Sequence, residues 1–171
     1  SVCSFVTARG FEPYSIYTKR IAREGKLLTH DSDQAVLTLL KTADVIESDF
    51  MIVNPHDSLE QLVRVVEESK RNLFPVTDKE GCLQGIVSLD DIRPIMFHRE
   101  LYGNVLVYEL MQRPIEYVFI EERMESVMEK FERTGAWNLP VLDQGFHYVG
   151  FVSKSRILSS YREQLSQVSH E

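Results

Sequence analysis

The sequence predicts an α+β fold made of two similar units in tandem, and three observations support this. The chain aligns with itself at a shift of 65 positions: residues 51–92 match residues 116–157 without a gap, and ten of the 42 pairs are identical. Composition alone gives about two or three such matches. Each unit also combines short apolar runs with an amphipathic helical pattern, and both repeat the same turn residues at matching positions.

In the first unit, an apolar stretch at 50–53 predicts a strand, and the apolar stripe after it predicts an amphipathic helix. The stripe consists of Leu59, Leu62, Val63 and Val66. A hairpin is predicted next, with one strand at 74–77, a turn starting at Asp78 and a second strand ending at Ser88. A further helix is predicted to carry Ile92, Ile95 and Met96, with Pro94 early in it or kinking it.

The second unit follows the same plan, so each unit is predicted as β-α-β-β-α. Its opening strand falls at 117–120, its hairpin runs from Leu139 to Ser153, and its two helical patterns flank that hairpin. The stripes consist of Met124, Val127, Met128 and Phe131, and of Ile157, Leu158, Tyr161 and Leu165. A unit of about 50 residues buries too little surface alone. We therefore expect the two to pack sheet to sheet as a pseudo-twofold pair.

The charge and composition exclude several classes of protein. With 26 acidic and 19 basic side chains the net charge is −7, which argues against nucleic acid as a partner. No apolar run reaches the length of about 18 residues that a membrane span needs, so we expect the fragment itself to be soluble. The basic bias lies at the front, where residues 1–41 carry six Lys or Arg and four Asp or Glu.

Two motifs recur at the shift of 65 and carry a family resemblance. One is Pro75-Val76-Thr77-Asp78 with Pro140-Val141-Leu142-Asp143, and the other is Gly85-Ile86-Val87-Ser88 with Gly150-Phe151-Val152-Ser153. On these motifs, residues 45–160 resemble a tandem pair of CBS domains, also called a Bateman module. The resemblance implies CBS domain 1 at 45–100, CBS domain 2 at 101–165 and a tail at 166–171.

The stretch from Glu12 to Leu40 resembles the segment that joins the last membrane helix of chloride channels and chloride/proton antiporters (the ClC family) to their CBS pair. Residues 1–44 are then the end of a membrane domain and a linker, and Tyr14 or Tyr17 corresponds to the family's chloride-site tyrosine. The cluster Lys19, Arg20, Arg23 and Lys26 fits a membrane exit. An ordinary solvated helix explains these charges equally well.

The resemblance implies a regulatory and dimerisation module at the cytoplasmic face of the cell membrane. Its expected partners are a second copy of the chain, in a homodimer, and the membrane transport domain of the same polypeptide. A purely structural module that binds no nucleotide is a close rival. The alternative host is another transporter or a soluble metabolic enzyme that uses a nucleotide-sensing CBS module.

The resemblance also implies a candidate ligand, because CBS pairs often hold adenine nucleotides (ATP, ADP or AMP) between their repeats, where a Ser or Thr and an Asp three residues later meet the ribose. Ser88 and Asp91 have this spacing, whereas the second repeat has Ser153 and Arg156 and lacks the carboxylate acceptor. Helix capping explains these serines and Asp91 equally well. No cofactor is required by the sequence.

An adenine ring needs an apolar slot, which Phe50, Ile52, Leu73 and Phe74, or Ile115, Trp137 and Leu139, could line; an ordinary core is the alternative. The candidate ligand-binding residues are Ser88, Asp91, Phe50, Ile52, Leu73, Phe74, Trp137, Asn138 and Ser153. The five histidines have no ligand spacing and no catalytic fingerprint is present, so we expect neither a metal site nor an enzyme.

Overall fold

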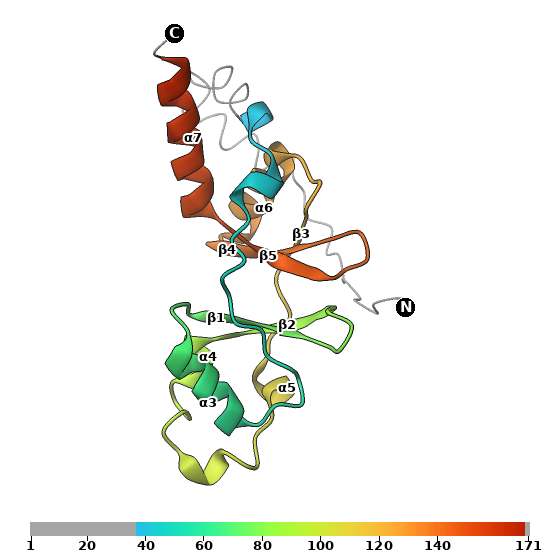
Figure 1. The fold of residues 1–171 in the computed structure, drawn as a ribbon, viewed down its shortest axis with the longest axis vertical. Coiled ribbons are helices and arrows are strands. Elements are labelled where there is room, and N and C mark those ends of the chain that lie inside the picture. Colours follow the sequence, from blue (N-terminus) through green and yellow to red (C-terminus); the bar gives the residue numbers. More distant parts are fainter. Residues whose placement is uncertain (1–36, 170–171) are drawn as a thin grey trace.

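The structure, a computed structural model, describes residues 37–169 (Figure 1). It confirms the predicted α+β fold with two tandem units, called here the first and second repeat. In chain order the elements are η2 (Thr42–Val45), α3 (Leu59–Glu68), β1 (Leu73–Thr77), β2 (Leu83–Ser88), α4 (Leu89–Ile92), η3 (Arg99–Leu101), α5 (Val107–Leu110), β3 (Val118–Phe119), α6 (Met124–Thr134), β4 (Asn138–Leu142), β5 (Tyr148–Ser153) and α7 (Lys154–Val168). The predictions for Tyr14, Tyr17 and the basic cluster lie outside the described residues.

Each repeat is built on an antiparallel hairpin, β1 with β2 and β4 with β5. In the second repeat β3 joins β4 in parallel, pairing Val118 with Val141. In the first repeat the predicted strand at 50–53 is reduced to one parallel pair, Val53 with Val76. That part of the prediction is wrong, because the chain before Val53 follows the other repeat: the Phe50 and Phe151 rings lie 4.6 Å apart.

Backbone pairing between the repeats shows the pseudo-twofold relation directly. The shift of 65 positions converts the pair Glu47 with Phe151 into the pair Gln112 with Ile86. It likewise converts the pair Lys41 with Arg123 into the pair Leu106 with Ser58, and the pair Cys82 with His147 maps onto itself. The segment before each repeat, around Glu47 or Gln112, therefore crosses to the hairpin of the other repeat, and we call it a crossing segment. The pseudo-twofold axis passes between Cys82 and His147.

The glycines of the second motif lie where these crossing segments meet the hairpins. A Cβ at Gly150 would lie 2.6 Å from the carbonyl oxygen of Glu47, and one at Gly85 would lie 3.1 Å from that of Gln112. The contact at Gly150 leaves no room for a side chain, whereas at Gly85 the neighbouring backbone would have to move by a few tenths of an ångström. The motif therefore marks the point at which one repeat passes over the other.

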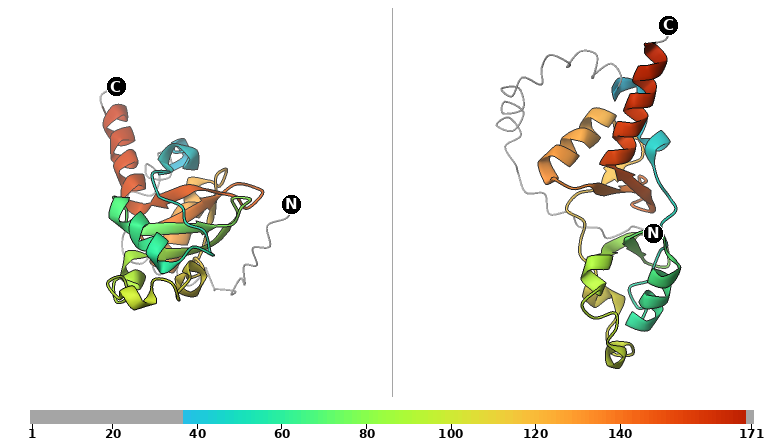
Figure 2. Two further views of the ribbon diagram at one scale, coloured as in Figure 1. Left: turned by 60° about the horizontal axis from the view of Figure 1, so that its bottom comes forward. Right: turned by 90° about the vertical axis from the view of Figure 1, so that its left-hand side faces the viewer.

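The two hairpins face each other in the middle of the molecule, and the helices lie outside them. Figure 2 shows α6 and α7 at one end and α3, α4 and α5 at the other. Leu83, Tyr117 and Leu142 are buried together where the sheets meet, with Phe146 and Tyr148 packed against them. Each repeat also has its own core between its sheet and its helices.

The helix predicted after Ser88 is much shorter than its counterpart after Ser153. α4 ends at Ile92, whereas α7 continues to Val168. Pro94 has no N–H to donate to the carbonyl of Asp90, so the helical ladder stops there, and Ile95 and Met96 form turns instead. Among residues 37–169, no helix is both long and apolar enough to cross a membrane.

Candidate functional site

Ser88 and Asp91 lie at the junction of β2 and α4, where they form a reciprocal cap. The Asp91 carboxylate Oδ2 accepts hydrogen bonds from the Ser88 backbone N–H at 3.0 Å and from its hydroxyl at 2.7 Å. The Asp91 N–H donates back to Ser88 Oγ at 3.2 Å. The capping interpretation of this pair is therefore confirmed, and it accounts for one of the two carboxylate oxygens. It fixes the rotamer of Asp91 and so the direction of the second carboxylate oxygen.

That second oxygen, Oδ1, accepts a hydrogen bond from the Gln112 side-chain amide at 3.0 Å. Gln112 belongs to the segment that crosses from one repeat to the hairpin of the other, where it pairs with Ile86. A carboxylate oxygen has two lone pairs, and Oδ1 uses one of them here. The carboxylate therefore has acceptor capacity left, on the side where the crossing segment runs.

A cleft of about 200 Å³ opens at this point between the two repeats, and we call it the open cleft. Its lining residues come from β2 and α4, from the crossing segment and from the start of β4. They are Ile86, Ser88, Asp91, Gln112, Arg113, Pro114, Ile115, Glu116, Ala136, Asn138, Leu139 and Pro140. The cleft thus offers a carboxylate, an amide and a guanidinium beside an apolar wall, which suits a ligand with both a flat apolar part and polar groups.

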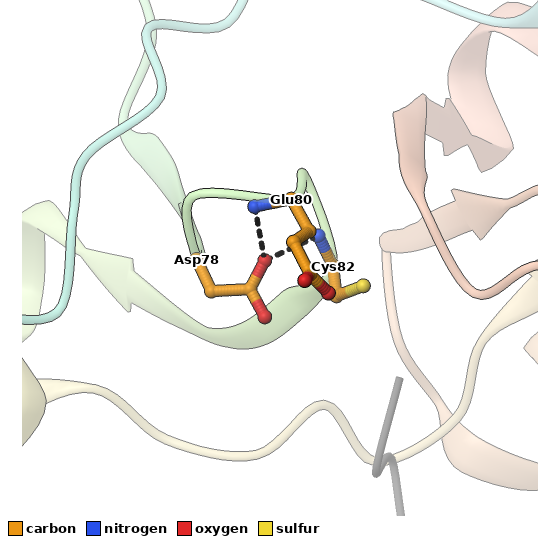
Figure 3. Close-up of side chains that lie close together, drawn as sticks. All are labelled: Asp78, Glu80 and Cys82. Carbon is orange, nitrogen blue, oxygen red and sulfur yellow. Dashed lines mark hydrogen bonds between the residues drawn. The ribbon is translucent and has the colours of Figure 1, made fainter. Parts of the chain in front are cut away.

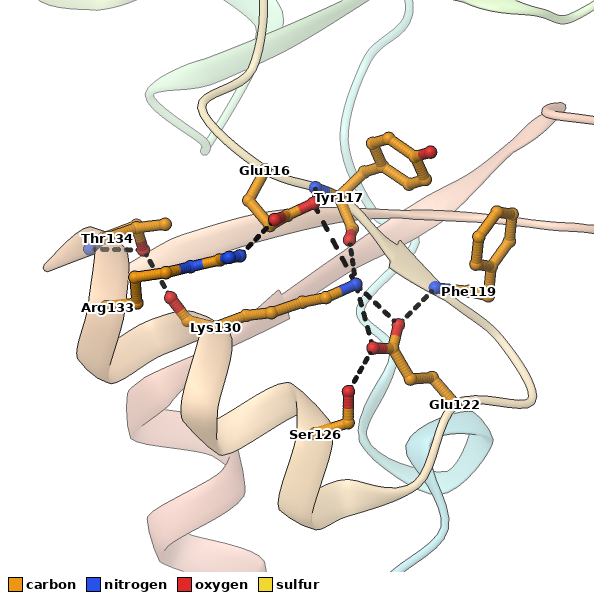
Figure 4. Close-up of polar contacts among 9 residues, drawn as sticks. Glu116, Tyr117, Phe119, Glu122, Ser126, Lys130, Arg133 and Thr134 are labelled. Atoms are coloured by element: carbon orange, nitrogen blue, oxygen red, sulfur yellow. Dashed lines mark hydrogen bonds and ion pairs between the residues drawn. The ribbon is translucent and has the colours of Figure 1, made fainter. Parts of the chain in front are cut away.

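Glu116 connects the lining of the open cleft to a group of charges between the β3 region and α6 (Figure 4). It pairs with Arg133, and Lys130 Nζ lies 3.9 Å away. Lys130 also donates to the Tyr117 carbonyl at 2.8 Å and pairs with Glu122 at 2.8 Å. A network of charged side chains therefore holds in place the part of the cleft wall that contains Glu116.

Glu122 shows what holds that network together. Burial by itself would raise the pKa of this carboxyl, but hydrogen bonds from Lys130, Ser126 and the Phe119 backbone N–H outweigh it and lower the pKa. Its side chain is only 14 % exposed. The carboxylate is consequently charged and saturated with donors, as a buried charge must be to persist.

At the position related to the open cleft by the pseudo-twofold axis, a side chain occupies the space; we call this the Arg71 site. Arg71 is the equivalent of Ala136 at the shift of 65. Its Nε and Nη2 donate to the two carboxylate oxygens of Asp49 at 2.9 and 2.7 Å, and Nη2 also reaches Glu47 at 3.1 Å. Its guanidinium lies 4.8 Å from the centroid of the Phe50 ring.

The structure brings only part of the predicted set together. Ser88, Asp91 and Asn138 line the open cleft, with Ile115 and Leu139 from the second proposed slot. Trp137 lies next to them in sequence but is 70 % exposed, with Lys154 Nζ 5.8 Å from its ring centroid.

The other candidates lie elsewhere. Phe50 is buried at the Arg71 site, Phe74 is fully buried in the core of the first repeat, and Leu73 is half-buried at the start of β1. Ile52 is exposed outside the open cleft, and Ser153 caps α7 by accepting from the Arg156 N–H. The two slots proposed from sequence are thus different places, one open and one filled.

Sequence reasoning missed Gln112, Arg113 and Arg71. None of them belongs to a repeated motif, so the only signal available was the shift of 65 itself. That shift pairs Gln112 with Glu47 and Ala136 with Arg71, and these substitutions mark where the two related positions differ.

The turn between β1 and β2 holds another group of polar side chains, Asp78, Glu80 and Cys82, whose ligand atoms lie within 4.8 Å of one another (Figure 3). Asp78 Oδ1 accepts from the N–H groups of Glu80 and Cys82, both at 2.9 Å. The equivalent Asp143 accepts in the same way from Gly145 and His147. The first motif thus ends in an aspartate that closes a turn. The sulfur of Cys82 is not a free thiol.

A comparison with protein families decides how this architecture is classified. The family described as CBS domain matches residues 43–97 and again residues 107–163. The chain belongs to the CBS domain family. The two matched segments carry the two hairpins and both repeated motifs, so the CBS pair is the pseudo-twofold body described above.

Similar proteins carry CBS pairs in different settings. The homoserine O-acetyltransferase of Methanosarcina acetivorans is 25% identical over 124 residues, which are 72% of this chain and 22% of that protein. This chain therefore spans only about a fifth of that relative. Among solved structures, CbpB in complex with c-di-AMP superposes with a TM-score of 0.67 at 16% identity, covering 81% of this chain and 95% of that one. CBSX2 in complex with AMP gives 0.60 at 21% identity, covering 72% and 96%. At these identities the likeness shows the fold.

Proposed function

We propose that this CBS pair is a non-catalytic regulatory module that binds an adenine nucleotide in the open cleft. The observation that carries the proposal is the Asp91 carboxylate, held by Ser88 so that Oδ1 faces the crossing segment at the wall of the cleft. Solved CBS pairs similar in fold hold AMP and c-di-AMP, which supports the choice of ligand class.

The chemistry of the lining fits this class. Ribose hydroxyls are donors, and a carboxylate that is already oriented accepts them without further ordering. Ile86, Ile115 and Leu139 provide apolar surface for a purine ring, and the Asn138 amide can pair with its edge. Arg113 supplies the positive charge for a phosphate. The dipole of α4 does not serve this purpose, because the helix has only 4 residues. A ligand regulates only through unequal affinity for two states of the host protein.

The test is calorimetric titration of ATP, ADP and AMP into the chain and into Asp91→Ala. We expect saturable binding of at least one nucleotide, weakened in the variant by about tenfold or more, because hydrogen bonds to a charged acceptor contribute about 1.5–3 kcal/mol. Absence of heat from every nucleotide at millimolar concentration would refute the proposal and leave a structural module as the better interpretation.

Asp90→Ala is the matched control. Asp90 occupies the same first turn of α4, but its side chain is 82 % exposed, pairs with Arg93 and does not line the cleft. Both substitutions remove one acidic charge from the same helix. An affinity loss of equal size in both variants would attribute the effect to charge or helix stability rather than to the open cleft.

A finer proposal concerns the host: we propose that the module regulates a chloride channel or chloride/proton antiporter from the cytoplasmic side. Its support is the resemblance of residues 12–40 to the linker of that family. The end of this segment, at Leu37 and Leu40, packs on the core of the second repeat, and the Thr38 hydroxyl donates to Glu125 at 3.1 Å. A linker joined to the core in this way can transmit a change in the CBS pair.

Chloride efflux from liposomes that contain the full-length protein tests this host. Efflux that responds to nucleotide and loses that response in Asp91→Ala supports it. Full-length protein that moves Mg²⁺ instead, or that transfers acetyl groups, would assign the module to the alternative host, another transporter or a metabolic enzyme such as the acetyltransferase relatives.

We also propose that two copies form a homodimer through the segments after Ser88 and Ser153. Phe97 is 82 % exposed and Leu158 is 41 % exposed; Met96, directly before Phe97, and Tyr161, three positions after Leu158, are half-buried. Closed twofold pairs are the commonest assemblies, and an apolar surface favours one. Sedimentation of the chain and of Phe97→Asp/Leu158→Asp tests this: we expect a dimer for the former and a monomer for the latter. A monomeric parent chain would overturn it.

A further inference from the structure

The Arg71 site is arranged like a binding site with its ligand in place. The Asp49 carboxylate meets the guanidinium along one edge with two parallel hydrogen bonds, which is the strongest geometry for this pair of groups. Glu47 accepts a third bond from the same guanidinium, and the Phe50 ring covers one face. Arg71 itself comes from the loop between α3 and β1, whereas its three partners lie on the crossing segment.

Two of the three partners, Glu47 and Phe50, contact the second repeat without the help of Arg71. The backbone of Glu47 exchanges two hydrogen bonds with Phe151 of β5, at 2.8 and 2.9 Å. Phe50 packs on Phe151 with ring centroids 4.6 Å apart, and the Tyr148 ring also contacts Phe151, with centroids 5.8 Å apart. The aromatic floor and both carboxylates therefore belong to a segment attached to the second repeat, while the guanidinium is delivered by the first.

The related positions of the open cleft show that this arrangement is specific to one side. There, Gln112, Pro114 and Ile115 stand where the Arg71 site has Glu47, Asp49 and Phe50, and Ala136 stands in place of Arg71. The arginine, its two carboxylates and its aromatic face are thus present together on one side, and none of the four is found at the related positions of the other side.

We propose that the Arg71 site is a guanidinium-binding site occupied in cis by Arg71, which joins the two repeats and excludes any other ligand from that position. The hydrogen bonds from Arg71 also hold the pKa of the Asp49 carboxyl below its ordinary value. A consequence, which rests on the proposed function, is that each chain takes a single nucleotide, in the open cleft, although the fold provides two related positions.

Chemical rescue of Arg71→Ala in the full chain tests the site. We expect its thermal midpoint to lie about 3–6 °C below that of the parent chain. N-ethylguanidinium at low millimolar concentration should recover most of this loss in a saturable manner, whereas N-ethylammonium at equal concentration should not. Neither cation should raise the midpoint of the parent chain, where Arg71 already fills the site.

Two variants separate the site from a general loss of positive charge. Arg64→Ala removes an arginine whose side chain is 71 % exposed and pairs only within α3, with Glu60; it should show almost no loss and no rescue. Arg71→Ala combined with Asp49→Asn should also lose the rescue. An Arg71→Ala midpoint equal to that of the parent chain, or equal recovery with both cations, would overturn the proposal.

Nuclear magnetic resonance of the parent chain tests the same site if Arg71→Ala does not fold. The Arg71 Nε–H should exchange slowly with solvent and lose this protection in Asp49→Asn; fast exchange in the parent chain would contradict an occupied site.

Calorimetry of the parent chain then measures how many nucleotides each chain binds. Two nucleotides per chain would refute the exclusion, whereas no binding at all would refute the proposed function and leave the rescue result standing.

Discussion

The open cleft and the Arg71 site have related backbones and different contents. On one side, Ala136 leaves a cleft of about 200 Å³ beside Asp91. On the other, Arg71 reaches across the repeat interface to Asp49 and Glu47. Duplication creates two equivalent positions, but the side chains at these positions differ, so that one is open and the other holds a guanidinium between two carboxylates. The fold alone therefore does not show that both positions can take a ligand.

Substitution of the glycines that lie against the crossing segments should have the largest effect on stability. Gly150→Ala places a Cβ 2.6 Å from the Glu47 carbonyl oxygen, whereas Gly85→Ala places one 3.0 Å from the flexible side chain of Met111 and 3.1 Å from the Gln112 carbonyl. We expect the free energy of unfolding to fall by about 3 kcal/mol for Gly150→Ala and by about 1 kcal/mol for Gly85→Ala. Urea denaturation measures both, and equal losses would show that the two crossings are equally tight.

Lys130→Met should have the next largest effect, because it leaves the Glu122 carboxylate buried without its ammonium partner. We expect a loss of about 2 kcal/mol at pH 7. The folded-state pKa of Glu122 is lowered from its ordinary value of 4.5, so this contribution is present above that pH and disappears as the pH falls through the folded pKa.

The difference between the parent chain and Lys130→Met should accordingly narrow below about pH 4. Urea titrations at pH 7 and pH 3.5 check this. The first repeat has Val65 at the position of Lys130 and serves as the internal reference, since Val65→Met should show no such pH dependence. A gap that stays constant with pH would mean that Lys130 acts through packing alone.

Transplanting the Arg71 site into the open cleft should abolish the difference between the two sides. In Pro114→Asp/Ala136→Arg, which keeps Gln112 and its hydrogen bond to Asp91, the new arginine finds a carboxylate at the position related to Asp49. We expect nucleotide affinity to fall about tenfold or more, equivalent to about 1.4 kcal/mol, without a large change in thermal midpoint. Unchanged affinity would indicate that the ligand lies outside the volume next to Ala136.

Trp137→Ala should have the smallest effect on stability. The ring is 70 % exposed, and Lys154 Nζ lies 5.8 Å from its centroid. We expect a change below about 0.5 kcal/mol in urea denaturation. Trp137 is the only tryptophan of the sequence, and it precedes Asn138 of the open cleft, so its fluorescence in the parent chain should change when nucleotide binds. A large loss of stability would show that the ring supports the repeat interface.

Much of the fold was accessible from the sequence because its signals are local. The short apolar runs of the hairpins and the apolar stripes of α3 and α6 depend on neighbours a few positions away. The shift of 65 then fixed how the pattern is repeated. Errors occurred where a distant contact or a missing donor intervenes: Phe50 is drawn to Phe151, and Pro94 ends α4 early.

The sequence by itself also indicated the local chemistry of the Ser88 and Asp91 pair, since a carboxylate three residues after a serine is a capping pattern at the start of a helix. Only the tertiary structure decided that Asp91 meets Gln112 across the repeat interface and that Asn138 shares its cleft. Likewise, Arg71 and Asp49 are 22 positions apart, and no local pattern links them. These contacts arise because each crossing segment pairs with the hairpin of the other repeat, and that pairing depends on the packing of the whole body.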